Sequence, residues 1–119
     1  MIYDYTFKLN TLDYGFDEKI SPLIKGYIEC IIIDIPDGVL DISLYLHEFM
    51  DICLFDAKSI SGQKYIPVRT DTITEDGQKF NFTQDKWCIN NSLHCIVEGG
   101  RDIEAIVTIR YSSDEKITI

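Results

Sequence analysis

Hydrophobic and polar residues alternate one by one along much of this sequence. In residues 3–9, aromatic or aliphatic side chains occupy every odd position and polar side chains every even position. Successive side chains of a β-strand point to opposite faces, so this period predicts a strand with one buried face. The pattern returns in residues 93–97 and 105–111, on either side of the Gly99-Gly100-Arg101-Asp102 turn. These two segments predict a β-hairpin, because glycines suit its tight turn.

The middle of the chain adds further strands between turn signals. Residues 23–35 are rich in β-branched side chains, and the run 31–33 does not alternate. A central strand buried on both faces or a β-bulge would explain this run. Pro36-Asp37-Gly38 is expected to end the strand with a turn. After a loop at 59–63, residues 65–69 predict a short strand, which Pro67 places at a sheet edge.

Two interpretations compete for residues 42–53. Residues 40–46 alternate as a strand does, whereas the apolar positions from Ile42 to Cys53 also fit a helical period that Asp41 could cap. Strict alternation directly after a Pro-Asp-Gly turn favours the strand. A turn at 47–51 would then lead into a strand at 52–55. Later in the chain, Asp76-Gly77 indicates a hairpin turn.

About eight short strands with no long helix predict an all-β fold. We expect an antiparallel β-sandwich or jelly-roll-like arrangement that forms one domain over residues 1–119. A chain of 119 residues can bury a sizeable core without a metal or a disulfide. Ile96 and Ile106 would point away from that core, so either a partner or a loop of the same chain is expected to cover them.

The net charge of the chain argues against some classes of binding partner. Eleven basic and twenty acidic residues give a net charge of −9. Such a surface repels phosphate backbones and anionic membranes, so neither a nucleic acid nor a membrane is an expected partner. The charge either keeps the domain soluble or forms an acidic face that binds a basic partner. With no signal peptide or membrane span in the sequence, we expect synthesis in the cytoplasm.

Motifs for metal or cofactor chemistry are incomplete in this sequence. The four cysteines form no CxxC pair, and we expect reduced thiols in or near the core. Cys88, His94 and Cys95 would need a fourth ligand to bind zinc. The acidic segment 71–76 does not match the spacing of a calcium loop. We therefore expect no metal and no cofactor.

Catalytic motifs are incomplete as well. His47 and His94 are the only histidines, and neither lies near a GxSxG nucleophile motif. We therefore expect no enzyme activity. Trp87 is expected in the core, although together with Tyr65 and two phenylalanines at positions 80 and 82 it could form a platform for sugars.

The order of these features resembles a family of virus proteins. The chain begins with Tyr-Asp-Tyr-Thr-Phe-Lys-Leu, continues with an Ile-rich strand and Tyr-Ile-Pro-Val-Arg at 65–69, and ends with Leu-His-Cys-Ile-Val-Glu-Gly-Gly followed by an alternating strand. This resembles small β-sandwich proteins encoded among the structural genes of tailed bacteriophages. The resemblance implies a non-enzymatic virion protein with no catalytic residues, attached to the capsid as a decoration protein or to the neck or tail.

The hypothesis of a virion protein leads to expected partners and contact residues. The expected partners are the major capsid protein or other virion proteins, with the chain present as a homo-oligomer or in many copies on a lattice. Alternatives are a carbohydrate- or host-surface-binding module and a cytoplasmic accessory protein. Contacts are expected at strand edges and loops, and the candidate residues are Tyr3, Tyr5, Tyr65, Pro67, Trp87, Gly99, Gly100, Arg101 and Asp102.

Overall fold

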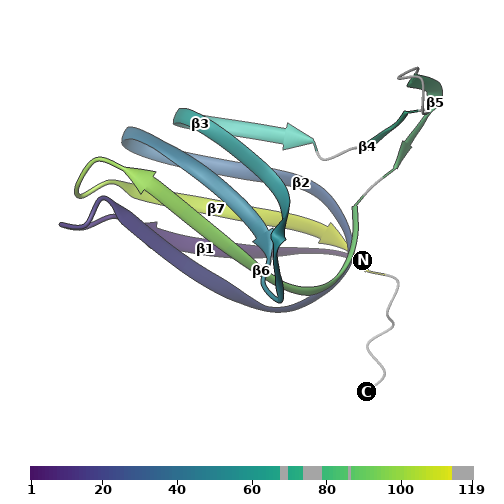
Figure 1. Ribbon diagram of the computed structural model, residues 1–119, viewed down its shortest axis with the longest axis horizontal. Coiled ribbons are helices and arrows are strands. Elements are labelled where there is room, and N and C mark those ends of the chain that lie inside the picture. The colour runs from purple at the N-terminus through teal and green to yellow at the C-terminus, as the bar shows by residue number, and fades with distance from the viewer. Residues whose placement is uncertain (68–69, 74–78, 86, 114–119) are drawn as a thin grey trace.

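A computed structural model describes residues 1–67, 70–73, 79–85 and 87–113, and all regular structure in these residues is β (Figure 1). Five strands form one antiparallel sheet, and two more pair separately. The all-β, antiparallel prediction is confirmed. The described part of the chain holds no helix that could cross a lipid bilayer. The strands are β1 (Ile2–Asn10), β2 (Phe16–Leu46), β3 (Phe49–Pro67), β4 (Thr70–Ile73), β5 (Lys79–Asp85), β6 (Trp87–Gly99) and β7 (Glu104–Ser112).

The 31-residue strand β2 organises the large sheet. Its residues 16–28 and 40–46 both pair with β6, and His94 of β6 is opposite Ile20 in one segment and Tyr45 in the other. The two segments therefore occupy the two edges of β6. Residues 27–34 pair with β7, and the first two of them, Tyr27 and Ile28, pair with both β6 and β7. In Figure 1, β2 accordingly passes from the front of the molecule to the back and returns.

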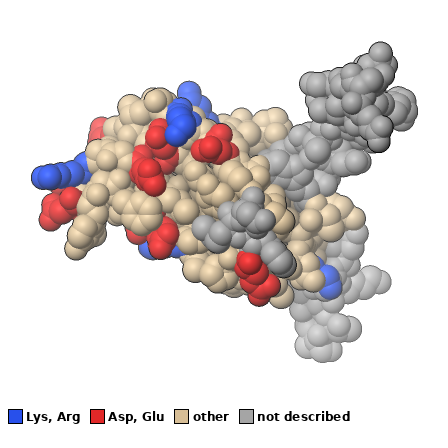
Figure 2. All heavy atoms as spheres, viewed as in Figure 1, with Lys and Arg blue, Asp and Glu red and all other residues tan. Residues whose placement is uncertain are grey.

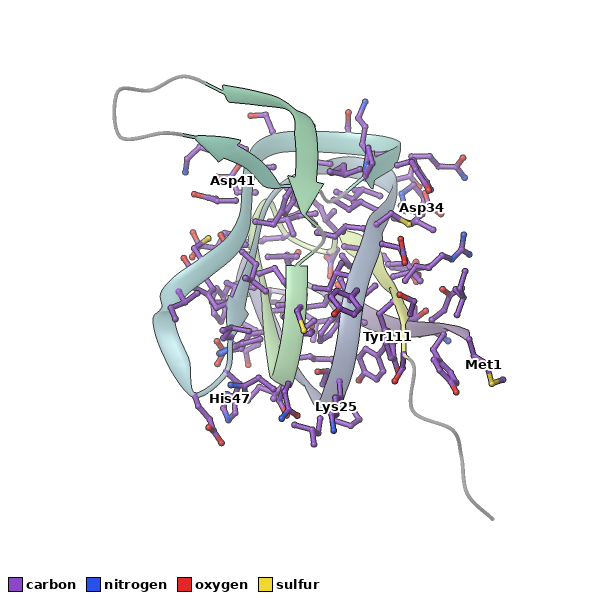
Figure 3. All side chains as sticks on the ribbon, turned by 90° about the vertical axis from the view of Figure 1, so that its right-hand side faces the viewer. Met1, Lys25, Asp34, Asp41, His47 and Tyr111 are labelled. Carbon is purple, nitrogen blue, oxygen red and sulfur yellow. The ribbon has the colours of Figure 1, made fainter. Side chains whose placement is uncertain are left out.

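The pairing divides the large sheet into two groups that share β2 and β3. The β6 group contains β6, both flanking segments of β2 and residues 49–60 of β3. The β7 group contains β1, β7, residues 27–34 of β2 and residues 62–67 of β3. In Figure 1 the β6 group lies toward the viewer and the β7 group lies behind it. Figure 3 shows Asp41 and His47 of the first group on the side opposite Met1 and Tyr111.

Two bends let β2 change partners without ending. Gly26 has a φ of 146°, and a Cβ at this position would overlap the carbonyl oxygen of Ser112 in β7. The second bend lies between Ile35 and Leu40, where the register with β3 shifts. The prediction that Pro36-Asp37-Gly38 ends the strand is therefore wrong, because the backbone stays extended there and β2 continues. The predicted loop at 59–63 is also wrong, since these residues continue β3 with positive φ only at Ser59 and Gly62.

The predicted hairpin of residues 93–97 and 105–111 is wrong. β6 and β7 exist as strands, but β6 pairs with β2 and β7 pairs with β1 and β2. Both edges of β6 over residues 94–98 are occupied by β2, so no edge remains for β7. The Gly99–Ile103 connection instead carries the chain from the β6 group to the β7 group.

Other local predictions are confirmed. Residues 42–46 are strand rather than helix, with a short turn at 47–48 before β3 begins. Residues 31–33 lie in the middle of the β7 group, between β7 and β3. Pro67 ends β3 at the edge of that group. β4 and β5 pair antiparallel, as the hairpin prediction requires, whereas Asp76 and Gly77 themselves lie outside the described residues.

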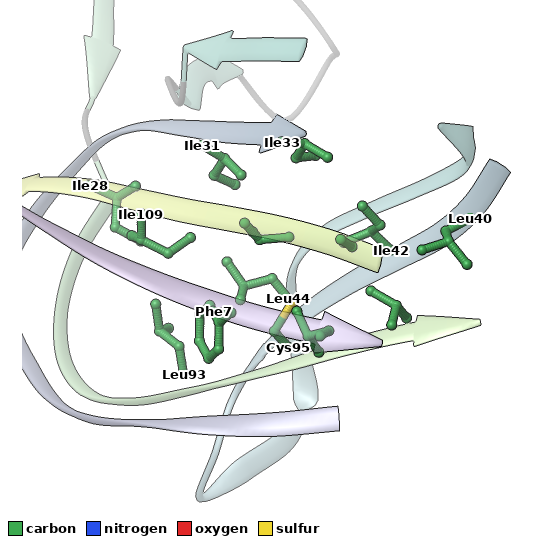
Figure 4. Close-up of a cluster of buried hydrophobic side chains, with 14 of the residues drawn as sticks. Phe7, Ile28, Ile31, Ile33, Leu40, Ile42, Leu44, Leu93, Cys95 and Ile109 are labelled. Carbon is green, nitrogen blue, oxygen red and sulfur yellow. The ribbon is translucent and has the colours of Figure 1, made fainter. Parts of the chain in front are cut away.

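The core lies between the two groups (Figure 4). In β1 the odd residues Phe7 and Leu9 are buried and the even residues are exposed, which confirms the predicted alternation. Ile96 and Ile106 are half-buried and point away from the core, one on each group. Among the described residues, no buried side-chain nitrogen or oxygen lacks a hydrogen-bond partner. The largest buried side chains are Phe7, Leu9, Ile28, Ile31, Ile33, Ile35, Leu40, Ile42, Leu44, Leu93, Val97 and Ile109.

Candidate binding surfaces

The outer side of the β6 group combines carboxylates with exposed apolar side chains. Leu93, Cys95 and Val97 of β6 point into the core, so the residues between them point outward. Directly opposite residues of neighbouring strands share a face of the sheet. The pairing therefore extends the outward row to both segments of β2 and to β3. We name this surface the β6 face, and its members are Phe16, Glu18, Ile20, Asp41, Ser43, Tyr45, Asp56, His94, Ile96 and Glu98.

Negative charge predominates on the β6 face. Lys58 lies 3.9 Å from the Asp41 carboxylate, while Asp56 accepts a hydrogen bond of 3.2 Å from Ser43. Glu18 contacts Nε2 of His94 at 2.9 Å. In Figure 2, which shows this side of the molecule, Asp and Glu lie across the surface and most Lys and Arg lie near its margin. A face of this kind complements a basic surface that also carries apolar groups.

Apolar groups lie among these carboxylates. Phe16 is 39% exposed and Ile20 is 48% exposed, and each is opposite a polar residue of β6. Ile96 is half-buried between Glu18 and Ser43 on the flanking strands. Exposed apolar side chains with polar groups around them are found at surfaces that bind another protein. The β6 face thus offers both an attractive charge and apolar area to a partner.

The outer side of the β7 group, which we name the β7 face, is held by cross-strand polar pairs. Arg110 donates two hydrogen bonds to the Asp4 carboxylate, at 2.9 and 3.1 Å. These hydrogen bonds hold the pKa of Asp4 below its ordinary value. The hydroxyl groups of Thr6 and Thr108 lie 3.1 Å apart. The paired side chains fix β1 to β7 in one register.

A hollow of about 480 Å³ lies near the β3 edge of the β7 face. Tyr65, which is 65% exposed, lines it together with Asp34, Gln63 and Lys64. An exposed aromatic ring next to a carboxylate and an amide can bind a sugar, because the ring packs on the apolar side of the sugar while the polar groups bind hydroxyls.

The structure separates the predicted contact residues into distinct places. Tyr3 and Tyr5 lie on β1 and are half-buried, with Tyr3 stacked on Tyr111 at 5.5 Å between ring centroids. Tyr65 and Pro67 lie at the opposite edge of the β7 group. The other predicted contact residues are the exposed turn of Gly99, Gly100, Arg101 and Asp102, and Trp87, whose side chain lies outside the described residues.

That turn is fixed at the far end of β1. Gly99 donates its N–H to the carbonyl of Gly15, and Asp102 donates its N–H to the carbonyl of Leu12. The three sets of predicted contacts therefore do not form one surface. They lie on the β1 edge, on the β3 edge and in the turn between β6 and β7.

The residues considered for zinc do not meet in the described structure. Cys95 points into the core and His94 points outward from the same strand, while Cys88 is exposed. Burial raises the pKa of the Cys95 thiol to about 12, so this thiol stays protonated at neutral pH. Cys30 is also buried, but Cys53 and Cys88 are exposed, contrary to the expectation that all four thiols lie in or near the core. No cluster of three or more metal-ligating side chains occurs among the described residues.

The β6 face was missed in the sequence. Its carboxylates come from segments far apart in the chain, and the alternation in residues 40–46 marks only Asp41 among them. Comparison with family models and with curated proteins finds no match for this chain. Its binding surfaces must therefore be judged from their own chemistry.

Proposed function

We propose that this chain is a non-enzymatic structural protein of a tailed-phage virion, which binds the outside of the capsid in many copies. The resemblance of its ordered motifs to small β-sandwich proteins of phage structural genes supports this function. So does the β6 face, whose carboxylates and apolar groups suit a basic or mixed patch on a coat protein. A neck or tail position would use the same surfaces.

The observation that carries the proposal is the order in which the strand segments pair. In the β7 group the order is β1, β7, residues 27–34 of β2 and residues 62–67 of β3. In the β6 group the order is residues 16–28 of β2, β6, residues 40–46 of β2 and residues 49–60 of β3. We infer that these segments form two facing sheets of four, a jelly roll. Viral capsid and lectin domains often use this fold.

Fold alone does not determine function, so the function has to be argued from the residues on the surface. The inner side chains of both groups are apolar and fill the space between them. The exposed charges and aromatic groups are therefore the parts of the molecule that a partner can reach. Attachment of many copies to a symmetric lattice would strengthen a contact that is weak for each copy.

Mass spectrometry of purified virions tests the proposal. We expect the chain to stay with the coat protein in particles of the phage that encodes it, after density-gradient purification and washing. Complete loss of the chain from washed particles would contradict a structural role. Recovery of the chain with isolated necks or tails, rather than with heads, would assign the protein to the neck or tail of the virion.

A binding assay on particles that lack the chain tests the β6 face. Asp56→Lys together with Glu98→Lys should weaken co-sedimentation with particles, because both substitutions place positive charge on this face. Glu104→Lys together with Asp37→Lys is a matched control, since both residues are exposed and outside the face. Equal binding by both double variants would exclude the β6 face as the contact.

The hollow beside Tyr65 favours a second candidate function, the binding of a host-surface carbohydrate. Lectin domains share the inferred fold, and the exposed Tyr65 lies near Asp34 and Gln63. Binding to a glycan array that Tyr65→Ala abolishes, while the Asp56 and Glu98 substitutions leave it unchanged, would support this function. An array without any bound glycan would leave the capsid role as the better account.

A further inference from the structure

β1 presents an unpaired backbone edge. Thr11 donates its N–H to the carbonyl of Ile103, and Met1 and Ser113 donate to each other's carbonyls. In an antiparallel ladder such hydrogen-bonded pairs recur at every second residue, so the odd residues of β1 bond to β7. The N–H and C=O groups of the even residues consequently face away from β7. These even residues are Ile2, Asp4, Thr6, Lys8 and Asn10.

A side-chain contact confirms this direction at one end of the strand. The N–H of Asn10 donates to Oδ2 of Asp17 at 2.9 Å rather than to a carbonyl of β7. The N–H groups of Asp4, Thr6 and Lys8 have no partner among the described residues. Edge strands are usually protected by prolines, bulges or short length, because a free edge can pair with another chain. β1 has nine residues in unbroken register and carries no proline.

We propose that two copies of this chain associate through β1, antiparallel to each other, about a twofold axis at Thr6. In this register Thr6 of one copy is opposite Thr6 of the second copy, and Asp4 is opposite Lys8 of the second copy. The hydrogen-bonding groups of the three residues then meet in pairs across the interface. A twofold arrangement forms each contact twice and closes the assembly as a dimer.

Charge complementarity selects this register from its neighbours. Asp4 and Lys8 lie at equal distances along the strand from Thr6, so an axis at Thr6 places opposite charges against each other in both pairs. An axis at Asp4 or at Lys8 would place like charges opposite each other. Axes at Tyr5 or Phe7 would leave both charges opposite uncharged residues. Lys8 has no ion-pair partner among the described residues and is therefore available.

The side chains already paired across β1 and β7 extend this pattern. Thr6 contacts Thr108, so the joined sheet would carry a row of four threonines across the axis. Asp4 would lie between Arg110 of its own chain and Lys8 of the second copy. The buried odd residues of β1 would keep their places in each core. The dimer does not depend on the proposed virion role, because every group in it belongs to this chain.

Analytical ultracentrifugation of the purified chain tests the dimer. We expect a mass that approaches twice 13.7 kDa as concentration rises. Thr6→Pro should give a monomer with an unchanged circular dichroism spectrum, since this substitution removes an N–H that faces the free edge. Lys8→Glu should raise the dissociation constant roughly tenfold, because it converts two attractive pairs into repulsive ones. Lys64→Glu, the same change on the β3 edge, should leave the constant unchanged.

A cysteine cross-link tests the position of the axis. In a chain whose exposed Cys53 and Cys88 are replaced by serine, Thr6→Cys should form an intermolecular disulfide, since opposite residues lie about 5.5 Å apart. Lys8→Cys should not, because the two copies of residue 8 would be about 13 Å apart along the strands. A monomer at every concentration, equal effects of Lys8→Glu and Lys64→Glu, or equal cross-linking at both positions would overturn the proposal.

Discussion

The two edges of the β7 group differ in regularity. At one edge, β1 pairs with β7 through nine consecutive residues without a shift in register. At the other edge, β3 pairs with β2 only over residues 62–67, begins this stretch with a positive φ at Gly62, and ends at Pro67. Irregular backbone and a terminal proline both hinder the addition of another strand. The β3 edge is thus protected against pairing, whereas the edge of β1 is unbroken and can accept another strand.

The difference also predicts where the fold tolerates change. Residues on the β1 side are held by a continuous ladder and by buried side chains of both groups. Residues at the β3 edge belong to a shorter ladder, and most of them are exposed to solvent. Substitutions in the middle of the group should therefore cost more stability than the same substitutions at the β3 edge.

Two glycine substitutions should show the largest contrast. Gly26→Ala should lower the free energy of unfolding by about 3 kcal/mol or more, because φ is strained and the new methyl group would overlap Ser112. Gly62→Ala should cost only about 1–2 kcal/mol, since its φ of 69° is strained but no atom lies within 4 Å of the added Cβ. Urea unfolding of both variants measures the difference. Equal costs would mean that β2 does not approach β7 closely at Gly26.

Truncation of isoleucines along one row of the sheet should show the next largest contrast. Ile109 is opposite Ile31, which is in turn opposite Ile66 at the β3 edge. Ile109→Ala should cost about 2–5 kcal/mol, because Ile109 is fully buried and the substitution leaves a cavity. Ile66→Ala should cost less, since Ile66 is half-buried. Denaturant unfolding tests this order, and a larger loss for Ile66 would contradict the view that the β3 edge is tolerant.

Sequence patterns predicted where the strands are, but not which strands pair with each other. Alternation in residues 3–9, 93–97 and 105–111 depends only on which face of a strand is buried, so it could be recognised locally. Pairing depends on which edges remain open after the whole chain has folded. β2 occupies both edges of β6, and nothing near Gly99 and Gly100 in the sequence indicates this. The hairpin prediction failed for that reason.

Strand ends were hard to predict for a related reason. Pro36-Asp37-Gly38 has the composition of a turn, yet the chain only bends there and continues to its next partner. A turn and a bend between two pairing segments use the same residues, because both need an unpaired N–H and an unusual φ. The candidate surfaces were likewise predictable only where a local sequence signal existed. Pro67 correctly predicted a sheet edge. The carboxylates of the β6 face, in contrast, become neighbours only because strands far apart in the sequence pair with each other.

The smallest of the expected effects concerns the ion pair that joins β1 to β7. Arg110 lowers the pKa of Asp4 in the folded chain, so the pair stabilises the fold at neutral pH and loses that contribution as the pH falls through the folded pKa. Asp4→Asn should therefore lower the melting temperature slightly at pH 7. The difference from the unmodified chain should disappear as the pH falls from about 5 to about 2.

The effect is small because both side chains are partly exposed to solvent, which screens the pair. Thermal unfolding followed by circular dichroism measures it, at a concentration where the chain is monomeric so that Lys8 of a second copy does not contribute. Asp34→Asn controls for the loss of a negative charge from the same face near the β3 edge. A difference between Asp4→Asn and the unmodified chain that stays constant down to pH 2 would show that Asp4 acts through packing rather than through its charge. The regular edge would then owe its register to the Thr6–Thr108 contact and to the backbone ladder alone.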